Sequence, residues 1–384
     1  FVYHPSIFLK KHLTVLINSL MVDIMGIFDF FKFEKKSKIL SLNERWIPTS
    51  DGMIRDSLRD SKPVWVIGTN VFERWIQGVE ERTGQSLGRR LAHAAAESEE
   101  FMLRKGKFQI PKGINPDSWL STLNDWHSRG IGYFNSLDSS DEETRVIISN
   151  PASGPICAGL LASTFEVSSN RRYRFRWVES KKQSLIFSLF PDNSDIPPPE
   201  EKLQTWSQED FQVSNLDLFD SLELGHNGSW AINSNRCMII HLDLILRFAD
   251  NCTTYLDQIH TGRVDYEFSG LDESEVVMWT AMADSIRDVT FETAPHILIS
   301  KPNDWKQTAH RHLSYNGLGA IYTAESIDSH GGVKLILDCC FHPAISGGIL
   351  LACWERAYGR RGKLNYQIDN GSVCFFLSSS VEIA

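Results

Sequence analysis

Apolar residues recur along the chain with two different spacings, which predict helices and strands in alternation. A short apolar run over residues 64–67 is typical of a buried strand. Large apolar residues then recur every three or four positions through residues 71–79, which predicts an amphipathic helix that ends at Gly84. Similar spacing predicts further helices over residues 87–95 and 117–127.

Alternation of apolar and polar positions predicts two β-hairpins on either side of another helix. Residues 131–149 contain two β-like runs joined by an acidic turn, and residues 154–172 follow as a helix. In the second hairpin, over residues 173–190, aromatic residues such as Phe175 alternate with arginines such as Arg174. These patterns place a helix between two hairpins.

The phrase GPICAGLLASTFEVSSNRR, which begins at Gly154, returns as PAISGGILLACWERAYGRR from Pro343. Aligning Gly159 with Gly348 gives an offset of 189 residues (348 − 159), and strand, helix and hairpin patterns recur in the same order. The matches at this offset are Ile156 with Ile345, Leu161 with Leu350, Glu166 with Glu355, Arg171 with Arg360, Arg172 with Arg361 and Trp177 with Tyr366. The repeat indicates an internal duplication.

The predicted fold class is therefore α+β, with two tandem copies of a helix-plus-antiparallel-sheet domain that form a pseudo-symmetric pair. We expect an N-terminal extension, partly disordered, over residues 1–60, and a first domain over residues 61–190. Residues 191–236, which contain three successive prolines, are expected to be a linker, and residues 237–384 the second domain. Met25 is the expected start of translation.

Small residues on the repeated helix allow another backbone to approach closely. Gly159 and Ser163 are four positions apart in the first copy, and Gly348 and Ala352 stand at the matching places. These faces either dock the two copies against each other or pack each helix within its own copy. Glu166 and Glu355, near the helix ends, are expected to form exposed ion pairs.

Composition narrows the functional classes. The chain has 384 residues, of which 42% are hydrophobic, and a formal net charge of −9, which argues against a general nucleic-acid binder. Its seven cysteines are an odd number and form no CxxC motif, although Cys339 and Cys340 are adjacent, which indicates reduced thiols in a cytoplasmic protein. The apolar stretch over residues 13–33 is too polar for a membrane span and lacks a signal-peptide cleavage site.

The stretch GIFDFFKF places large apolar residues beside lysines within residues 25–36. Such a segment either packs on its own domain or contacts a membrane surface or a partner. The residues expected to make that contact are Phe28, Phe30, Phe31 and Phe33.

Motifs for catalysis are missing from the sequence. It contains no GxxxxGK[ST], GxGxxG or HExxH motif. Cys157 lacks the glycine two positions before it that a nucleophile elbow needs. His310 and His312 are two positions apart on an expected helix, so they do not share a face for a metal. We expect no metal site and no cofactor.

The strand, the VFERWIQGVEERTG helix and the repeated phrase before a final hairpin together resemble the 4-vinyl-reductase-type domain. That family is related to TRAPP subunits and to the haem-NO-binding sensor fold. The resemblance implies an antiparallel sheet covered by helices, dimer-like pairing, and binding of small apolar molecules or proteins. The family often has two cysteines in its last hairpin, whereas this chain has only Cys374 there, so the resemblance carries no metal or redox role.

These observations favour a non-enzymatic sensor or adaptor that binds a small apolar ligand or a protein partner, with a homodimer as a further expectation. The alternative is an enzyme whose active site forms between the two copies. Aromatic residues at matching positions are either core or the lining of a pocket between hairpin and repeated helix. The candidate pocket residues are Cys157, Phe165, Trp177, Trp354, Tyr366 and Cys374.

Overall fold

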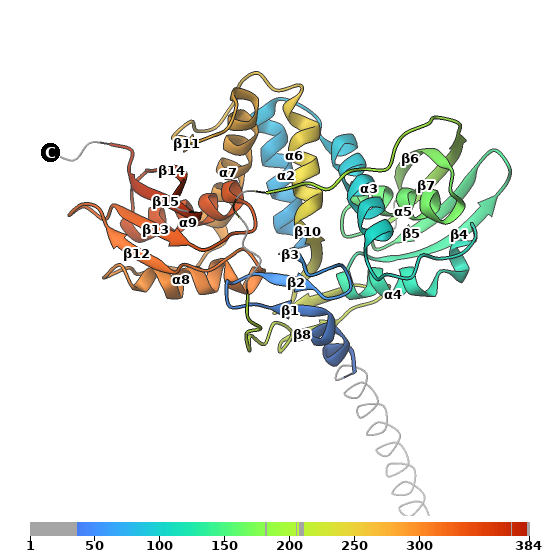
Figure 1. Cartoon of the computed structure of the whole chain (residues 1–384), viewed down its shortest axis with the longest axis horizontal. Coiled ribbons are helices and arrows are strands. Elements are labelled where there is room, and N and C mark those ends of the chain that lie inside the picture. Colours follow the sequence, from blue (N-terminus) through green and yellow to red (C-terminus); the bar gives the residue numbers. More distant parts are fainter. Residues whose placement is uncertain (1–36, 181–182, 205, 207–210, 370, 382–384) are drawn as a thin grey trace, which may run out of the picture.

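The computed structural model describes residues 37–180, 183–204, 206, 211–369 and 371–381. In this part of the chain helices combine with three β-sheets, which confirms the predicted α+β class. Figure 1 shows one sheet in the middle of the molecule and another towards each end. No helix within the described ranges is both long and apolar enough to cross a bilayer.

The first half of the molecule is defined as residues 37–192 and begins with a helical stretch over residues 37–45. Its further elements are β1 (Trp46–Pro48), β2 (Ile54–Asp56), β3 (Lys62–Gly68), α2 (Thr69–Thr83), α3 (Gly88–Lys105), a 3-10 turn (Pro116–Ser118), α4 (Leu120–Arg129), β4 (Tyr133–Ser139), β5 (Thr144–Ser149), α5 (Gly154–Ser169), β6 (Arg172–Ser180) and β7 (Ser184–Asp192).

The second half is defined as residues 222–381, and residues 193–221 form the connecting segment. Its elements are β8 (Leu222–Leu224), β9 (Trp230–Ile232), β10 (Asn235–His241), α6 (Leu242–Thr253), β11 (Tyr266–Phe268), α7 (Glu273–Thr293), α8 (Asp304–His312), a 3-10 turn (Ser314–Asn316), β12 (Thr323–Ser326), β13 (Val333–Leu337), α9 (Pro343–Tyr358), β14 (Gly362–Asp369) and β15 (Ser372–Ser379).

The central sheet joins the two halves in the strand order β1-β2-β3-β10-β9-β8. β3 and β10 are antiparallel, with Val66 opposite Ile239 at the middle of the pairing. Side chains alternate across these strands. Trp65 and Met238 pack into the larger core on one face, whereas Val66 and Ile239 pack into a smaller core on the other face.

Two segments outside the two predicted domains fold into the central sheet. Residues 37–60 were assigned to the N-terminal extension, yet they fold into the first half, where Trp46 is fully buried. Likewise β8 and β9 lie within residues 191–236, the predicted linker, and extend the central sheet beside β10. Each of these strands has only three residues, which is too short to show a clear alternation in the sequence.

Each half has a second sheet with the same strand order. The first is β4-β5-β7-β6, and the other is β12-β13-β15-β14, with β11 added in parallel beyond β14. The predicted hairpins are thereby confirmed, and α5 and α9 each follow the second strand of their sheet. Both helices have proline in the first turn and end at a residue in the left-handed conformation, Asn170 (φ 51°) and Gly359 (φ 66°).

The small residues of the repeated helix pack within their own half, so the expectation that they dock the two halves is corrected. A Cβ on Gly159 would lie 2.1 Å from the Ala92 oxygen of α3, and one on Gly348 would lie 2.3 Å from the Ala283 oxygen of α7. Ser163 and Ala352 are also fully buried. Helix α5 therefore packs against α3, and α9 against α7, because glycine lets the backbones touch.

The halves meet through other helices. α2 lies against α7, where the Trp75 indole donates to the Met282 carbonyl and the Ser285 hydroxyl donates to the Trp75 carbonyl. α3 lies against α6 on the other side (Figure 1). The inter-half contact thus consists of β3 with β10 and of these two helix pairs.

Glu166 and Glu355 are not the exposed ion pairs expected from the sequence. Glu355 is 5% exposed and accepts hydrogen bonds from the Gly362 amide (2.8 Å) and the Arg263 guanidinium (2.6 Å). Glu166 is partly buried and accepts from the Tyr173 amide at 2.9 Å. Each carboxylate stabilises the turn between the repeated helix and the next strand.

Candidate binding site

A hollow of about 450 Å³ opens in the first half where α2, the starts of α3 and α5, and the tip of the β6–β7 hairpin meet. We call it the first-half hollow. Its apolar lining comes from Phe72, Ile76, Leu91 and Leu185. Its volume lies within the roughly 300–1,000 Å³ that is usual for small-molecule sites.

The first-half hollow exists because the residues around it are small. Gly88, Ala152, Ser153 and Gly154 all line it. A Cβ on Gly88 would meet only the Pro155 side chain, at 3.8 Å, so this position faces open space. Backbone rather than side chains therefore forms much of this wall.

The corresponding place in the second half is filled with aromatic rings. Matching α3 to α7 through their glycine contacts puts Trp279 where the first half has Gly88. The repeat offset puts His342 at the place of Ser153 and Phe341 at the place of Ala152. All three side chains are buried, and they fill the place where the first half has a hollow.

Trp206 of the connecting segment completes this filling. Its ring lies 5.4 Å from that of Trp279 and 5.6 Å from that of His342, and its indole donates to the Phe341 carbonyl at 3.4 Å. Burial lowers the pKa of His342 to about 3, so its imidazole is neutral. Its Nδ1 accepts from the Ala344 amide at the start of α9.

The polar groups of the first-half hollow are suited to binding. The Glu80 carboxylate accepts from the Leu87 amide at 2.6 Å, and Glu73 and Glu179 lie at the same hollow. Neither cysteine nor histidine lines it, so it offers no thiol nucleophile and no imidazole base. The lining combines an apolar wall with carboxylates, which fits a ligand that has an apolar body and a hydrogen-bond donor.

The six predicted pocket residues line neither this hollow nor the three others described below. Phe165 packs edge-on against Trp119 in the core, with ring centres 4.6 Å apart, and the Trp354 indole donates to the Gly331 carbonyl. Cys374 and Tyr366 are buried as well. Trp177 is only half-buried and lies beside Gly154 at the edge of the first-half hollow.

The cysteines are packing residues in this structure. All seven have free thiols and are buried. Burial raises the pKa of Cys157 to about 11 and that of Cys353 to about 12, so both stay protonated at neutral pH. Within the described ranges, no group of three or more His, Cys, Asp or Glu side chains is placed to hold a metal ion.

A buried ionic cluster connects the central sheet to α3 and α4. The Asp56 carboxylate binds the Arg45 guanidinium at 2.7 Å and the His241 imidazole at 3.0 Å. Burial raises the pKa of Asp56, but the hydrogen bonds from His241 and Arg45 lower it further, so Asp56 stays ionised. Arg59, Glu99, Asp125 and Arg129 continue the cluster.

The alternative prediction was an enzyme with its active site between the two copies, and the ionic cluster lies between the two halves. Burial lowers the pKa of His241 to about 4, which leaves a neutral imidazole beside Asp56. Both residues are buried, His241 with 1% and Asp56 with 0% of its surface exposed, whereas Arg59 borders a hollow of about 280 Å³. The paired charges of this cluster hold the central sheet, α3 and α4 together.

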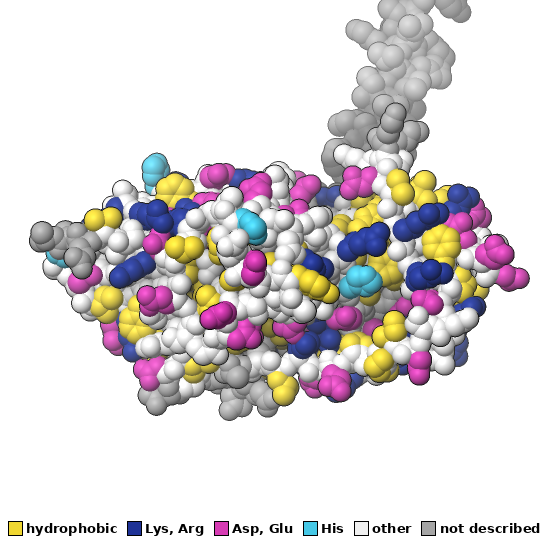
Figure 2. Space-filling view, turned by 90° about the horizontal axis from the view of Figure 1, so that it is seen from above, with side chains coloured by type: hydrophobic (Ala, Val, Ile, Leu, Met, Phe, Trp, Pro, Cys, Tyr) yellow, Lys and Arg dark blue, Asp and Glu magenta, His cyan; other side chains and the backbone are white. Residues whose placement is uncertain are grey.

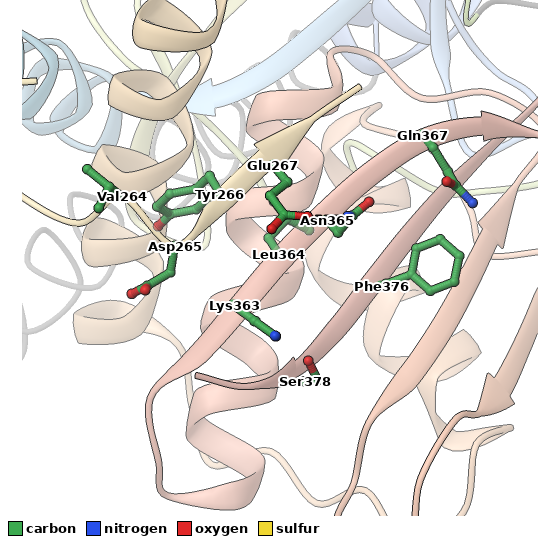
Figure 3. Close-up of a pocket in the computed structure, with 10 residues that line it drawn as sticks. All are labelled: Val264, Asp265, Tyr266, Glu267, Lys363, Leu364, Asn365, Gln367, Phe376 and Ser378. Carbon is green, nitrogen blue, oxygen red and sulfur yellow. Dashed lines mark hydrogen bonds between the residues drawn. The ribbon is translucent and has the colours of Figure 1, made fainter. Parts of the chain in front are cut away.

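A further hollow of about 510 Å³ lies on the outer face of the second-half sheet. Figure 3 shows it between β11, β14 and β15, with Glu267 beside Asn365. The Asn365 amide donates to Glu267 at 2.5 Å, and the Arg361 guanidinium donates to Asp265 at 2.7 Å. Its carboxylates are therefore already paired.

The comparisons with known proteins add no identity. No family model matches this chain, and no curated protein matches it either. The resemblance to the 4-vinyl-reductase-type domain rests on the sequence motifs alone. The small residues of the first-half hollow were missed at the sequence level, because their meaning appears only when Gly88 is matched with Trp279.

Proposed function

We propose that this protein is a non-enzymatic binding protein, built from two tandem copies of one α+β unit that pair about an approximate twofold axis. The first copy would carry the ligand site, and the second copy would be its filled counterpart. In this proposal each half is a relative of the 4-vinyl-reductase-type domain. The proposal is supported by matched contacts in the two halves and by the difference between their hollows.

Hydrogen bonds at matching positions support the duplication. The Cys157 thiol donates to the Ile131 carbonyl in the first half, and the Ser346 hydroxyl donates to the Leu318 carbonyl in the second half. Cys157 and Ser346 are separated by the repeat offset, as are Glu166 and Glu355. Contacts between helix and loop at these matching sites are expected if both halves derive from one ancestral unit.

The centre of the molecule supports a twofold arrangement. A Cβ on Gly130 of the first half would lie 2.5 Å from the Cys237 carbonyl of β10. A Cβ on Gly317 of the second half would lie 2.4 Å from the Val64 carbonyl of β3. Each half thus places an equivalent left-handed glycine against the other half's central strand, which is the reciprocity of an isologous contact.

The observation that carries the binding proposal is the open first-half hollow at a place that the second half fills. The hollow of about 450 Å³ is concave, and its apolar lining, of which Phe72, Leu91 and Leu185 are at most 2% exposed, is a packed wall on which the apolar body of a small molecule can lie. The three carboxylates at its lining favour a ligand with a donor or a positive charge.

Native mass spectrometry of the purified chain tests the proposal. We expect a fraction of the chain to retain a small molecule of defined mass. Gly88→Trp places the second half's ring in the hollow and should abolish that adduct, whereas Gly88→Ala should retain it. An adduct of equal abundance in Gly88→Trp, or no adduct in the unaltered chain, contradicts the proposal.

A further inference from the structure

The edge of β6 in the first half lacks a strand that the second half has at the same place. β14 pairs with β15 on one side and with the parallel strand β11 on the other. Within the described residues β6, the counterpart of β14, pairs only with β7. We propose that this edge is a docking site for an extended segment of a partner protein, which joins the sheet as a parallel strand. This goes beyond the ligand site proposed above.

The chain itself explains why the edge is open. Only residues 84–87 connect α2 to α3, which is too short a connection to supply a strand. Residues 254–272 connect α6 to α7 and contain β11. Within the described residues no strand pairs with β6 at the place that β11 fills, and the nearest segment is the proline stretch, where the Arg172 guanidinium donates to the Ile196 carbonyl at 2.7 Å.

In the second half β11 binds through its backbone and two aromatic side chains. The Leu364 amide donates to the Asp265 carbonyl (3.0 Å), and the Ser269 amide donates to the Tyr366 carbonyl (3.1 Å). Tyr266 and Phe268 are 5% and 6% exposed. These two side chains cover the sheet residues Leu364 and Tyr366, which are 1% and 2% exposed.

The polar end of Tyr266 also has a partner below the sheet. Its hydroxyl donates to the Asp284 carboxylate of α7 at 2.7 Å. The ring centre of Phe268 lies 5.4 Å from that of Trp279, which is also on α7. The strand is thus held by the sheet edge on one side and by α7 on the other.

The corresponding surface of the first half is only partly covered, by the proline segment at the start of β6. Phe175 and Trp177 stand at the places of Leu364 and Tyr366, and both are only partly buried. Their amide and carbonyl groups face away from β7, since the matching groups of β14 face β11. His93 stands at the place of Asp284 and is exposed, with its ring centre 5.5 Å from that of Phe175.

A groove of about 450 Å³ already follows this surface. It lies between α3, the first residues of β6 and the proline segment of the connecting chain, and His93, Ala96, Tyr173 and Phe175 line it. It gives space for an aromatic ring at the position that Tyr266 has in the second half. Figure 2 shows hydrophobic side chains among Lys and Arg side chains at the first-half end of the molecule.

Charge defines the chemistry of the partner segment. In β11, Glu267 lies between the two aromatic residues and pairs with Asn365. The first half has Arg176 at the place of Asn365 and Arg174 at the place of Lys363, both largely exposed and in loose contact, at 3.8 Å, with Glu143 and Asp192 respectively. The site therefore fits an extended segment with an acidic residue between two large apolar residues.

The capped peptide VDYEFSG, which has the sequence of residues 264–270, is the probe for this site. We expect saturable binding to the full chain in calorimetry, with hydrogen-exchange protection of residues 172–180 and unchanged exchange in residues 362–369. Protection confined to residues 362–369 would mean that the peptide only replaces β11, and it would overturn the proposal, as would an absence of binding.

His93→Asp gives the sharpest test, because it installs the second half's acceptor at an exposed position. The ratio of the dissociation constants of the VDFEFSG and VDYEFSG peptides should rise about tenfold in His93→Asp relative to the unaltered chain, since only tyrosine can donate to the new carboxylate. An unchanged ratio contradicts the proposed register.

Arg176→Glu tests the charge preference. We expect it to weaken VDYEFSG binding by up to about fivefold at low salt, whereas the same charge change at Lys306→Glu, on exposed α8, should have little effect. Equal weakening by both variants would show a general charge effect and contradict binding at β6. Gly88→Trp fills the first-half hollow. It should abolish the small-molecule adduct and leave VDYEFSG binding unchanged, so the two proposals can fail separately.

Discussion

The two halves share a scaffold and differ in how completely they cover it. The second half covers the edge of β14 with β11 and fills its interior with Trp206, Trp279 and His342. The first half leaves the edge of β6 open and keeps a hollow beside Gly88. Both proposed binding surfaces thus lie where the first half lacks covering elements that the second half has.

Glu166 and Glu355 stabilise matching turns, so removing either carboxylate should lower the free energy of unfolding. The loss should be larger for Glu355, which is more deeply buried. Glu355→Gln should lower the free energy of unfolding by about 3 kcal/mol, because Arg263 and Arg287 both lose a buried charged partner and Arg263 keeps only the longer contact with Asp265 (3.4 Å). Glu166→Gln should cost about 1 kcal/mol, since Arg172 also pairs with Glu100. Urea unfolding midpoints measure both, and equal losses would contradict the difference in burial.

The helix crossing in each half should be equally intolerant of a methyl group. Gly159→Ala and Gly348→Ala should each cost about 2 kcal/mol, because the new Cβ would overlap a carbonyl of the neighbouring helix. Gly88→Ala, in helix α3 but facing open space, is the matched control and should gain up to about 0.5 kcal/mol. Thermal unfolding of the three variants would show whether the two crossings are alike.

The free energy of unfolding should depend on pH through His342 in the filled interior of the second half, whereas the matching place in the first half has no such group. Burial lowers the pKa of His342 to about 3 from an ordinary value near 6.5, so the unfolded chain binds a proton first as the pH falls. The stability that the neutral imidazole contributes is complete above pH ~6.5 and is lost towards pH ~3, by about 2 kcal/mol at pH 5.

His342→Asn keeps a capping side chain at the start of α9 and removes this titration. The loss of stability between pH 7 and pH 5 should therefore become smaller by about 2 kcal/mol in urea unfolding. The first half has Ser153 at this place, which does not titrate in this range. An unchanged pH dependence would mean that His342 does not stay neutral in the folded chain.

The smallest expected difference is at the ends of the repeated helices. Asn170 and Gly359 both have positive φ angles, of 51° and 66°. Asn170→Gly should raise the free energy of unfolding by no more than about 0.5 kcal/mol, and Gly359→Asn should lower it by a similar amount. Differential scanning calorimetry of the pair would resolve opposite signs, and changes of the same sign would contradict equivalent helix ends.

The sequence predicts the long helices and strands well and the short strands poorly. The repeated helix, its hairpins and helices α2 and α4 follow clear periodic patterns, and the structure confirms them. Strands β1, β2, β8 and β9 were missed because three residues give too little alternation to distinguish a strand from a loop.

The candidate site was harder to predict than the fold. Aromatic residues at matching positions, such as Phe165 and Trp354, were natural pocket candidates, yet burial makes them core. The hollow is defined instead by the small residues Gly88 and Ser153, and the open edge by the short connection between α2 and α3. Small side chains and a short connection leave no periodic pattern in the sequence, so the hollow and the open strand edge could be recognised only in the structure.

The pairing of β3 with β10 has a consequence for synthesis of the protein. The two strands begin 173 residues apart (235 − 62), so a ribosome working at about 5–20 residues per second completes β10 roughly 10–35 s after β3. During that interval β3 pairs with β2 but has one open edge, and it bears Trp65 and Ile67, which are buried in the finished molecule. An exposed apolar strand of this kind is a binding site for chaperones and a starting point for aggregation, so the cell must protect the first half until the second has been made.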